Sequence, residues 1–135
     1  MTSSTLPLSA EQLAVFGSLP EDRPVVMLNL LRFREQATYE DPLEACSGRE
    51  AYKRYSQSSL QTIAAVGGSV IFSGKTHPSL VAPAGETWHQ VFLVRYPSPA
   101  AFRTMLAMPE YQAGLRHRTA ALADSRLVPI TPYPA

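Results

Sequence analysis

The amino-acid sequence predicts a single α+β domain in which strands and helices follow one another in the order β-α-β-β-α-β. Three observations support this fold class. The chain has 135 residues, a length typical of one domain. Hydrophobic residues make up 45% of it, enough for a core that needs neither disulfides nor a metal. Capping signals and breaks at glycine or proline divide the chain into short segments whose apolar pattern alternates between strand and helix.

The first two segments are a short helix and a strand. Ser9 followed by Gln12 forms a capping box, which predicts a helix over residues 10–19 within an N-terminal extension of residues 1–20. The stretch Val25–Phe33 is strongly apolar and rich in residues that favour strands, and it is too short for a free-standing helix. We therefore expect the first strand here.

A long helix and a second strand follow. Ser47 with Glu50 forms a second capping box, at the start of a helix that we expect to reach residue 66. The glycine pair at 67–68 allows the positive φ with which such helices end, and Ser69–Lys75 then predicts a strand. The side chains that should face the core at helical spacing are Tyr52, Tyr55, Ser59, Ile63 and Val66.

The second half of the chain repeats this alternation. A strand over 88–96 ends at a sharp boundary, where Ser98 can cap a helix and Pro99 fits its first position. The remaining expected segments are a helix over 99–108, a break at Pro109, a second helical segment over 110–123, a turn at Asp124 and Ser125, a strand over 126–130 and a loose tail over 131–135. Without the N-terminal helix, this order is the ferredoxin-like arrangement, a four-stranded antiparallel sheet with both helices on one face.

Both faces of the predicted sheet are apolar. In Val25–Phe33 the odd-numbered and the even-numbered residues are each mostly apolar, and neither set in 88–96 is polar throughout. A sheet face open to water alternates cleanly, whereas a sheet buried on both sides has continuous apolar runs. We therefore expect a second copy of the chain to cover the open face, sheet against sheet, in a two-fold homodimer. The alternative is a monomer whose open face is shielded by the N-terminal helix.

The composition argues against several classes of partner. A net charge of +1 gives no electrostatic basis for binding nucleic acid or an anionic membrane. Cys46 is the single cysteine, the three histidines lack metal-ligand spacing, and there is no glycine-rich dinucleotide or phosphate loop, so we expect neither metal nor cofactor. No apolar stretch reaches the roughly 20 residues of a membrane span. Residues 1–7 lack a basic segment followed by an apolar run, and we expect a cytoplasmic protein.

Several short motifs occur together in a pattern typical of a known family. They are Gly67-Gly68, Trp88, Tyr96-Pro97, Met108-Pro109-Glu110-Tyr111-Gln112, Arg118 and Ala123-Asp124-Ser125-Arg126-Leu127-Val128. With these motifs the chain resembles the domain of unknown function 1330 family over residues 48–130, most specifically over 109–128. The stretch Val25–Phe33 resembles a longer-chain subgroup with an extra N-terminal segment.

The resemblance implies a dimeric α+β barrel, in which two ferredoxin-like sheets form one closed barrel. Relatives of this fold include cofactor-free monooxygenases, muconolactone isomerases and haem-handling proteins, but a shared fold does not imply a shared function. The family has no established catalytic residues to carry over. Many members have an acidic residue where this chain has Arg95, so a family site that uses that acid is in doubt here.

Four polar residues in the apolar strands are candidate ligand contacts. Asn29 could orient a carbonyl or hydroxyl group inside a cavity, or it could satisfy a nearby backbone group. Arg32 has the opposite parity, so both would reach one cavity only if the strand carries a bulge. His89 and Arg95 share parity, and His89 could act as a general base near neutral pH, although a histidine at a strand start is more often exposed or structural.

Arg118 is the most informative charged residue. It lies at helical spacing with Tyr111, Leu115 and Leu122, on the stripe that should face inward, and a buried guanidinium requires a partner. The favoured interpretation is a structural Arg118–Asp124 ion pair that fixes the turn into the last strand. The alternative is that Arg118 binds an anionic ligand.

Two functional hypotheses follow. In the first, the protein is a homodimer that binds a small organic molecule in a mostly apolar cavity, with oxygenation or isomerisation of a small organic acid or quinone-like compound as the reaction if it is an enzyme. In the second, it is a non-catalytic dimeric module that binds another protein, with a packed interior and an exposed apolar patch. A cavity that receives Asn29 and Arg95 would favour the first.

Overall fold

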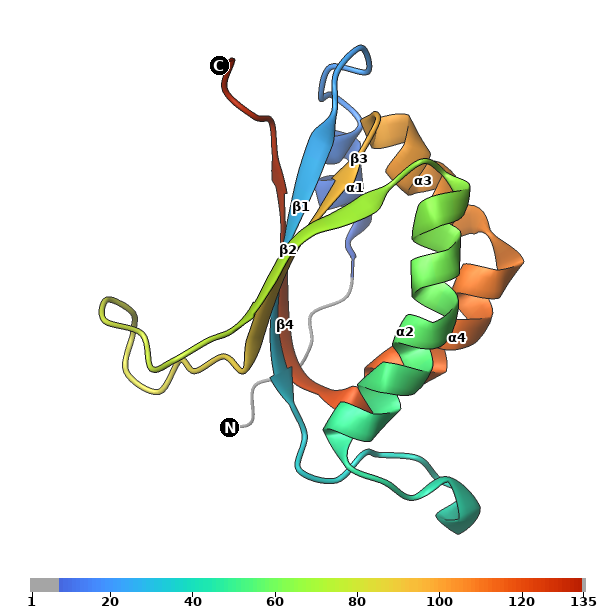
Figure 1. The fold of residues 1–135 in the computed structure, drawn as a ribbon, viewed down its shortest axis with the longest axis vertical. Helices are drawn as coiled ribbons and strands as arrows, with labels where there is room; N and C mark the ends of the chain where they lie inside the picture. Colours follow the sequence, from blue (N-terminus) through green and yellow to red (C-terminus); the bar gives the residue numbers. More distant parts are fainter. Residues whose placement is uncertain (1–7, 135) are drawn as a thin grey trace.

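The structure is a computed structural model that describes residues 8–134, an antiparallel sheet with helices packed on one face (Figure 1). Residues 1–7, where we expected no leader sequence, and residue 135 of the expected loose tail lie outside the described residues. The elements in chain order are α1 (Ala10–Phe16), β1 (Val25–Phe33), the short 3-10 helix η1 (Pro42–Glu44), α2 (Gly48–Ala65), β2 (Ser69–Lys75), β3 (Gln90–Tyr96), α3 (Pro99–Ala107), α4 (Pro109–Ala121) and β4 (Leu122–Ile130).

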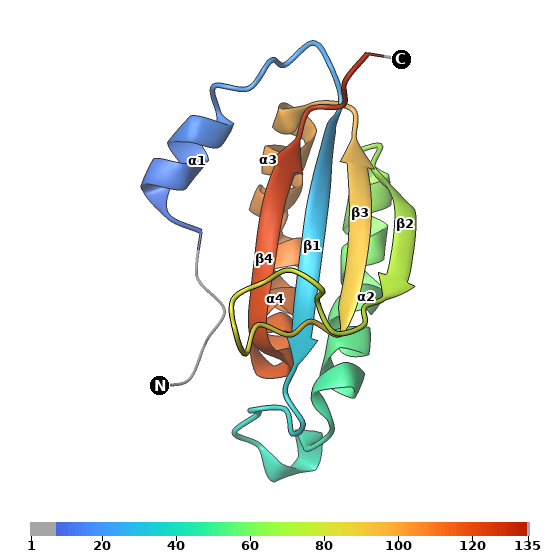
Figure 2. The same ribbon diagram turned by 90° about the vertical axis from the view of Figure 1, so that its left-hand side faces the viewer.

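The sheet has the strand order β2-β3-β1-β4, which confirms the predicted ferredoxin-like fold. Strand β1 pairs antiparallel with β3 on one side and with β4 on the other. Figure 2 shows the four strands side by side with α2, α3 and α4 behind them. The sheet therefore has an inner face toward these helices and an outer face on the opposite side.

The predicted capping serines begin their helices. The Oγ of Ser47 accepts a hydrogen bond from the backbone N–H of Glu50 at 3.0 Å, and that of Ser98 accepts from Ala101 at 3.2 Å. Helix α2 ends beside Gly67, which has a φ of 82°. A side chain at this φ would be strained, so the glycine lets the chain turn directly from α2 into β2.

The core lies between the inner face and the helices. In β1 the odd-numbered Met27, Leu31 and Phe33 are buried in it, as alternation along a strand requires. The expected stripe of α2 meets them: Tyr52, Tyr55, Ser59 and Ile63 are buried, and Val66 packs against the cluster. The rings of Phe33 and Tyr52 meet edge-on at 5.5 Å between centroids.

Strand β4 begins earlier than the sequence predicts. We expected Asp124 and Ser125 in a turn, but they are strand residues, opposite Arg32 and Leu31 of β1. Pairing with the central strand supplies backbone hydrogen bonds that outweigh the turn preference of these two side chains. Pro129 is tolerated in β4 because β4 is an edge strand.

Helix α1 does not shield the outer face. Its Phe16 packs edge-on against Phe102 of α3, with 5.4 Å between ring centroids, on the helical side of the sheet. In Figure 2, α1 lies beyond the edge formed by β4, and the loop between β2 and β3 crosses in front of one end of the sheet. The shielding by the first helix that the monomer alternative required is therefore not found in the described structure.

Candidate functional site

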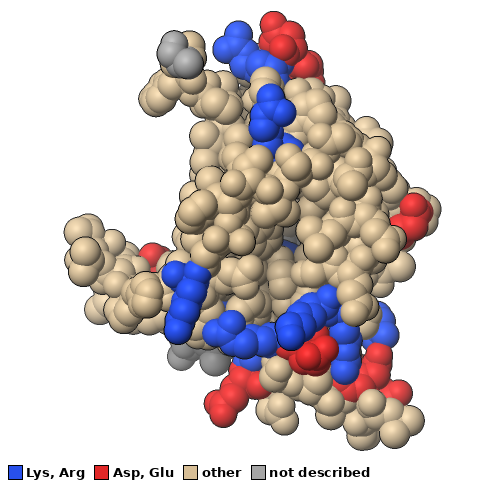
Figure 3. All heavy atoms as spheres, in the orientation of Figure 1, with Lys and Arg blue, Asp and Glu red and all other residues tan. Residues whose placement is uncertain are grey.

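A cavity of about 1200 Å³ lies between the inner face of the sheet and the helices. Small-molecule sites in proteins typically have volumes of roughly 300–1,000 Å³, so this one could hold a ligand of several rings. Its walls come from all four strands and from α2, α3 and α4, and Leu13 of α1 also lines it. Figure 3 shows a recess in the surface between β2 and α2, with Lys and Arg side chains gathered below it.

Helices α2 and α4 pack closely on each other, and the cavity lies between them and the sheet. Gly114 of α4 approaches α2 so closely that an added Cβ would lie 2.7 Å from the Oγ of Ser58. Aromatic rings from α2 and β3, those of Tyr52 and Phe92, meet across the interior with 6.5 Å between their centroids. The helices thus pack on each other and reach the sheet through large side chains, between which the cavity remains.

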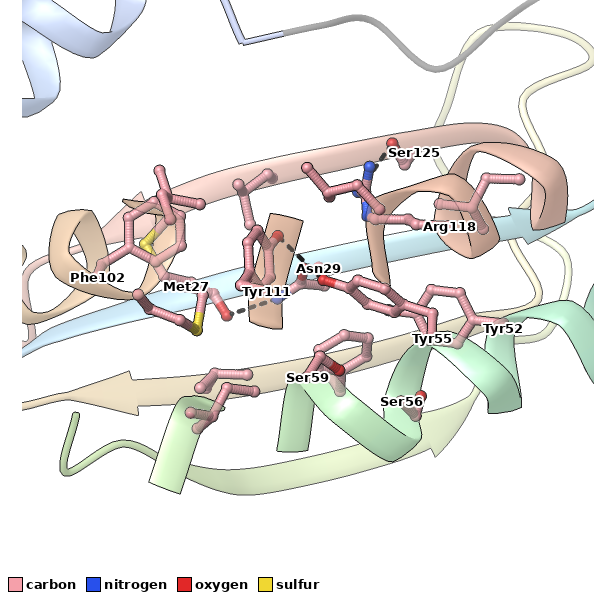
Figure 4. Close-up of a pocket in the computed structure, with 18 of the residues that line it drawn as sticks. Met27, Asn29, Tyr52, Tyr55, Ser56, Ser59, Phe102, Tyr111, Arg118 and Ser125 are labelled. Carbon is pink, nitrogen blue, oxygen red and sulfur yellow. Dashed lines mark hydrogen bonds between the residues drawn. The ribbon is translucent and has the colours of Figure 1, made fainter. Parts of the chain in front are cut away.

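Two buried tyrosines form a polar pair in the cavity wall. The hydroxyl of Tyr55 donates a hydrogen bond to the hydroxyl of Tyr111 at 3.0 Å (Figure 4). Burial raises the pKa of Tyr55 well above its usual value, the neighbouring Tyr111 raises it further, and the positive charge of Arg118 acts in the opposite direction. Burial likewise raises the pKa of Tyr52. Tyr52 and Tyr55 therefore cannot supply a phenolate base near pH 7. Because the Tyr55 hydroxyl donates to Tyr111, the hydroxyl of the pair that is left to donate to a ligand is that of Tyr111.

Asn29 lies at the middle of the cavity, on the inner face of β1. Its side-chain amide donates a hydrogen bond to the carbonyl oxygen of Met27 at 3.2 Å. This bond fixes the plane of the amide, and its oxygen accepts no hydrogen bond from any described residue. Both functions considered for Asn29 are thus compatible in one side chain, because it satisfies a backbone group and lines the cavity.

Arginines mark one end of the cavity. Arg118, in the last turn of α4, donates a hydrogen bond to the Oγ of Ser125 at 3.4 Å (Figure 4). Arg34 also lines the cavity, and its Nε is buried without a hydrogen-bond partner. Arg126 touches the cavity but forms an ion pair with Asp124 at 2.7 Å and covers the ring of Trp88. The described lining residues include no aspartate or glutamate.

The expected Arg118–Asp124 ion pair does not form. Asp124 and Ser125 are neighbours in a strand, so their side chains point to opposite faces of the sheet. Ser125 faces the helices and meets Arg118, whereas Asp124 binds Arg126, which follows two residues later on the same face. The prediction was wrong because it placed both residues in a turn, where this alternation does not apply.

Three of the five candidate contacts lie outside the cavity lining. Arg32 and Arg95 have the parity of the outer face, opposite Asp124 and Val26 in the sheet. His89 precedes β3, where its Nδ1 accepts a hydrogen bond from the backbone N–H of Phe33 at 3.0 Å. Burial lowers the pKa of His89, and the nearby positive charges of Arg49 and Arg32 lower it further. The structure therefore brings together Asn29 and Arg118 and leaves Arg32, His89 and Arg95 away from them.

Sequence reasoning missed the polar part of the helical wall. Tyr55 and Tyr111 belong to the inward stripes of α2 and α4, where tyrosine usually indicates core. Helical spacing placed Tyr111 and Arg118 on one face of α4, but it did not indicate that the Tyr111 hydroxyl would meet that of Tyr55. No sequence pattern indicated that Arg34 would line the cavity, because it lies just after the end of a predicted strand.

Two other kinds of site have no candidate among the described residues. Within residues 8–134, no group of three His, Cys, Asp or Glu side chains could hold a metal ion. The helices of this part of the chain are all too short or too polar to cross a membrane.

Comparison with known proteins gives one family and several solved structures. Residues 44–131 match the family described as Domain of unknown function (DUF1330). The crystal structure of the methylated RPA0582 protein is 37% identical, with a TM-score of 0.89, and the match covers 99% of this chain and 98% of that chain. A structure of the RPA0582 protein of unknown function from Rhodopseudomonas palustris is 34% identical, with a TM-score of 0.89, over 98% of this chain and 100% of that one.

More distant structures share the fold alone. SnoaB, a cofactor-independent oxygenase from Streptomyces nogalater, is 14% identical, with a TM-score of 0.52, over 84% of this chain and 96% of that chain. A dimeric protein of unknown function with a ferredoxin-like fold, from Bacteroides fragilis, is 14% identical, with a TM-score of 0.51, over 82% of this chain and 98% of that one. No curated protein matches the chain.

Proposed function

The chain belongs to the family described as Domain of unknown function (DUF1330), and we propose that it binds a small organic molecule in the cavity between its sheet and its helices. The observation that carries this proposal is the cavity itself, which is mostly apolar but lined by a few convergent polar groups. Such a combination is typical of small-molecule sites. The polar groups are the amide of Asn29, the hydroxyl pair of Tyr55 and Tyr111, and the guanidinium of Arg118.

If the bound molecule is transformed, we propose cofactor-free oxygenation or isomerisation as the reaction. In isomerisation a proton moves between two positions of the substrate, and in oxygenation O2 is the co-substrate. The second N–H of the Asn29 amide and the Tyr111 hydroxyl, which accepts from Tyr55, could hydrogen-bond a substrate carbonyl as charge develops on its oxygen. The shared fold with a cofactor-independent oxygenase supports this by analogy of fold alone.

We also propose a homodimer formed through the outer sheet faces. Leu28 of β1 lies directly opposite Leu93 of β3 on this face, and Val128 of β4 is 47% exposed. A continuous apolar face of this kind requires cover, and a second copy supplies it with two-fold symmetry. A fold neighbour is described as dimeric, which supports the association of two chains by analogy of fold alone.

The competing function is a non-catalytic module that binds another protein. It predicts a packed interior, whereas the structure has a cavity of about 1200 Å³ lined by Asn29. The outer sheet face is the surface such a module would use, and the homodimer occupies that same surface. The small-molecule function is therefore the better supported of the two.

A ligand screen tests the proposed function. The purified protein is examined by native mass spectrometry and then by thermal shift against a library of small organic compounds. We expect hits whose stabilisation is lost in Ser59→Leu, because Ser59 is a buried lining residue and the larger side chain fills the cavity. The control Gln61→Leu changes an exposed position of the same helix and should leave the hits unchanged. The proposal fails if no compound stabilises the protein, or if Ser59→Leu responds as the wild type does.

A further inference from the structure

We infer that the ligand of this cavity is an organic carboxylate, with its negative group bound at Arg118 and an apolar body directed toward Phe102. This inference rests on the proposed function, since it specifies the chemistry of the same cavity. It follows from the two ends of the cavity, which differ in charge and in polarity (Figure 4).

Arg118 has unused hydrogen-bonding capacity inside the protein. A guanidinium offers five N–H donors in a planar fork. Of these, one forms the bond of 3.4 Å to Ser125, and no carboxylate of a described residue lies within ion-pair distance of Arg118. A charge drawn out of water is costly unless it is paired, and two parallel bonds to a carboxylate are the pairing that a guanidinium fits best. The dipole of α4 favours a cation at the C-terminal end of the helix. A guanidinium directed to solvent would satisfy that preference equally, so the dipole does not explain why Arg118 lines the cavity.

Arg34 adds a second positive group at the same end. Its backbone is fixed, because its N–H donates to the carbonyl of Ala121 at 2.8 Å and its carbonyl accepts from Gly48 at 3.1 Å. These bonds hold the start of the Arg34 side chain beside the C-terminus of α4, one turn beyond Arg118. The Nε of Arg34 is buried and has no hydrogen-bond partner among the described residues, which is rare for a buried polar atom, so the guanidinium is not fully satisfied within the chain.

Nothing in the lining neutralises this end. None of the described lining residues is an aspartate or glutamate, and Asp124, the residue before Ser125, is already bound to Arg126. The tyrosines close to Arg118 do not supply a negative charge either, because burial raises the pKa of Tyr52 and of Tyr55. The anion must therefore come with the ligand.

The opposite end accepts an apolar group. It is lined by Met27 of β1, Ile63 of α2, and Phe102 and Met105 of α3, all of which are buried. Figure 4 shows Met27 and Phe102 at one end of the cavity, Arg118 and Ser125 at the other, and Asn29 with the Tyr55–Tyr111 pair between them. A monocarboxylate with an aromatic or alkyl body matches this gradient, whereas a compact inorganic anion would leave the apolar end unfilled.

Matched pairs of acids and amides test the inference. Isothermal titration calorimetry compares 4-phenylbutanoate with 4-phenylbutanamide, and naphthalene-2-carboxylate with its amide, because each pair has the same shape and differs in charge. We expect the acid of at least one pair to bind about tenfold or more tightly than its amide, as a charge-assisted bidentate pair should. That preference should vanish in Arg118→Met and persist in Arg23→Met, which changes an exposed arginine with a side chain 54% exposed.

The outcomes separate the inference from the proposed function. Amides that bind as tightly as their acids, or an acid preference that survives Arg118→Met, would overturn the inference and leave the cavity as a site for neutral ligands. If no member of either pair binds the wild type at millimolar concentration, the inference is overturned, whereas the proposed function is decided separately by the ligand screen. Circular dichroism checks that Arg118→Met is folded, and Arg118→Lys provides a second variant, which should retain the charge preference at reduced affinity because the fork is lost.

Discussion

The two faces of strand β1 carry different chemistry although their residues alternate along one stretch of chain. On the inner face, Met27 and Leu31 are buried in the core and Asn29 between them lines a cavity. On the outer face, Leu28 and Leu30 are only half-buried, and no helix covers them in the described structure. The inner face is thus completed within one chain and the outer face is not. This difference is the basis for the two proposals, a ligand at the inner face and a second copy of the chain at the outer face.

The largest expected effect is on the inner face. Leu31 is fully buried, so Leu31→Ala should lower the free energy of unfolding by about 2–5 kcal/mol through lost burial and the space left behind. Urea denaturation measures this loss, which should hardly vary with protein concentration. A loss of unfolding free energy below about 1 kcal/mol would show that the core tolerates this deletion. The inner face would then not differ from the outer face in its contribution to folding.

On the outer face the expected effect is on assembly rather than on folding. Leu28→Arg places a charge where two sheets are proposed to meet, and an unpaired charge in a dry interface is strongly unfavourable. Sedimentation velocity should find two associated chains in the wild type and single folded chains in the variant. The control Leu43→Arg changes a leucine that is 94% exposed in η1 and should not alter assembly. A wild type that sediments as one chain at micromolar concentration would contradict the homodimer.

Substitutions in the Tyr55–Tyr111 pair of the cavity wall should lower the free energy of unfolding by a smaller amount, and the loss should depend on whether one or both hydroxyls are removed. Tyr111→Phe removes the acceptor of the Tyr55 hydroxyl and leaves a buried donor unpaired, which should cost about 1–3 kcal/mol. The double variant Tyr55→Phe with Tyr111→Phe removes both polar groups and should recover most of that loss. Denaturation of the two single variants and the double variant completes this double-mutant cycle. If the losses of unfolding free energy in the single variants add up in the double variant, the two hydroxyls are not coupled.

The smallest expected effect is a dependence on pH. Burial, with the charges of Arg49 and Arg32, holds the pKa of His89 in the folded chain below its ordinary value of 6.5. The folded state therefore favours neutral His89, and this contribution is present above pH 6.5 and is lost as the pH falls below it. The melting temperature should fall slightly between pH 7 and pH 5.5, and His89→Asn should reduce the slope while still accepting the N–H of Phe33. His117, whose pKa burial also lowers, should account for part of the remaining slope. If the slope of the melting temperature against pH is unchanged in His89→Asn, His89 does not contribute to the pH dependence.

Local signals in the sequence were sufficient for much of the fold. The bounds of β1 and β2 agree with prediction because both strands are short apolar runs between clear breaks, and α2 begins at its predicted cap. The start of β4 could not be predicted, because it depends on pairing with a strand some ninety residues earlier in the chain.

The candidate site was predicted less well, for a related reason. Helical spacing placed Arg118 on the inner stripe, whereas parity within the strand separated Asn29 from Arg32 but left open which of the two reaches a cavity. The partners of Arg118, however, depend on which face of β4 each neighbour occupies, and this was unknown while Asp124 and Ser125 were assigned to a turn. The cavity itself depends on how closely α4 approaches α2 at Gly114, a distance that no local pattern encodes.

A crystal structure with a bromine-labelled aryl carboxylate tests the central claim most directly. The anomalous signal locates the bromine, and the electron density locates the carboxylate. We predict the bromine near Phe102 and Met105, and the carboxylate within hydrogen-bond distance of Arg118. A label found only on the outer surface, or one inside the cavity with its carboxylate turned away from Arg118, would contradict the claim that this cavity receives an organic anion.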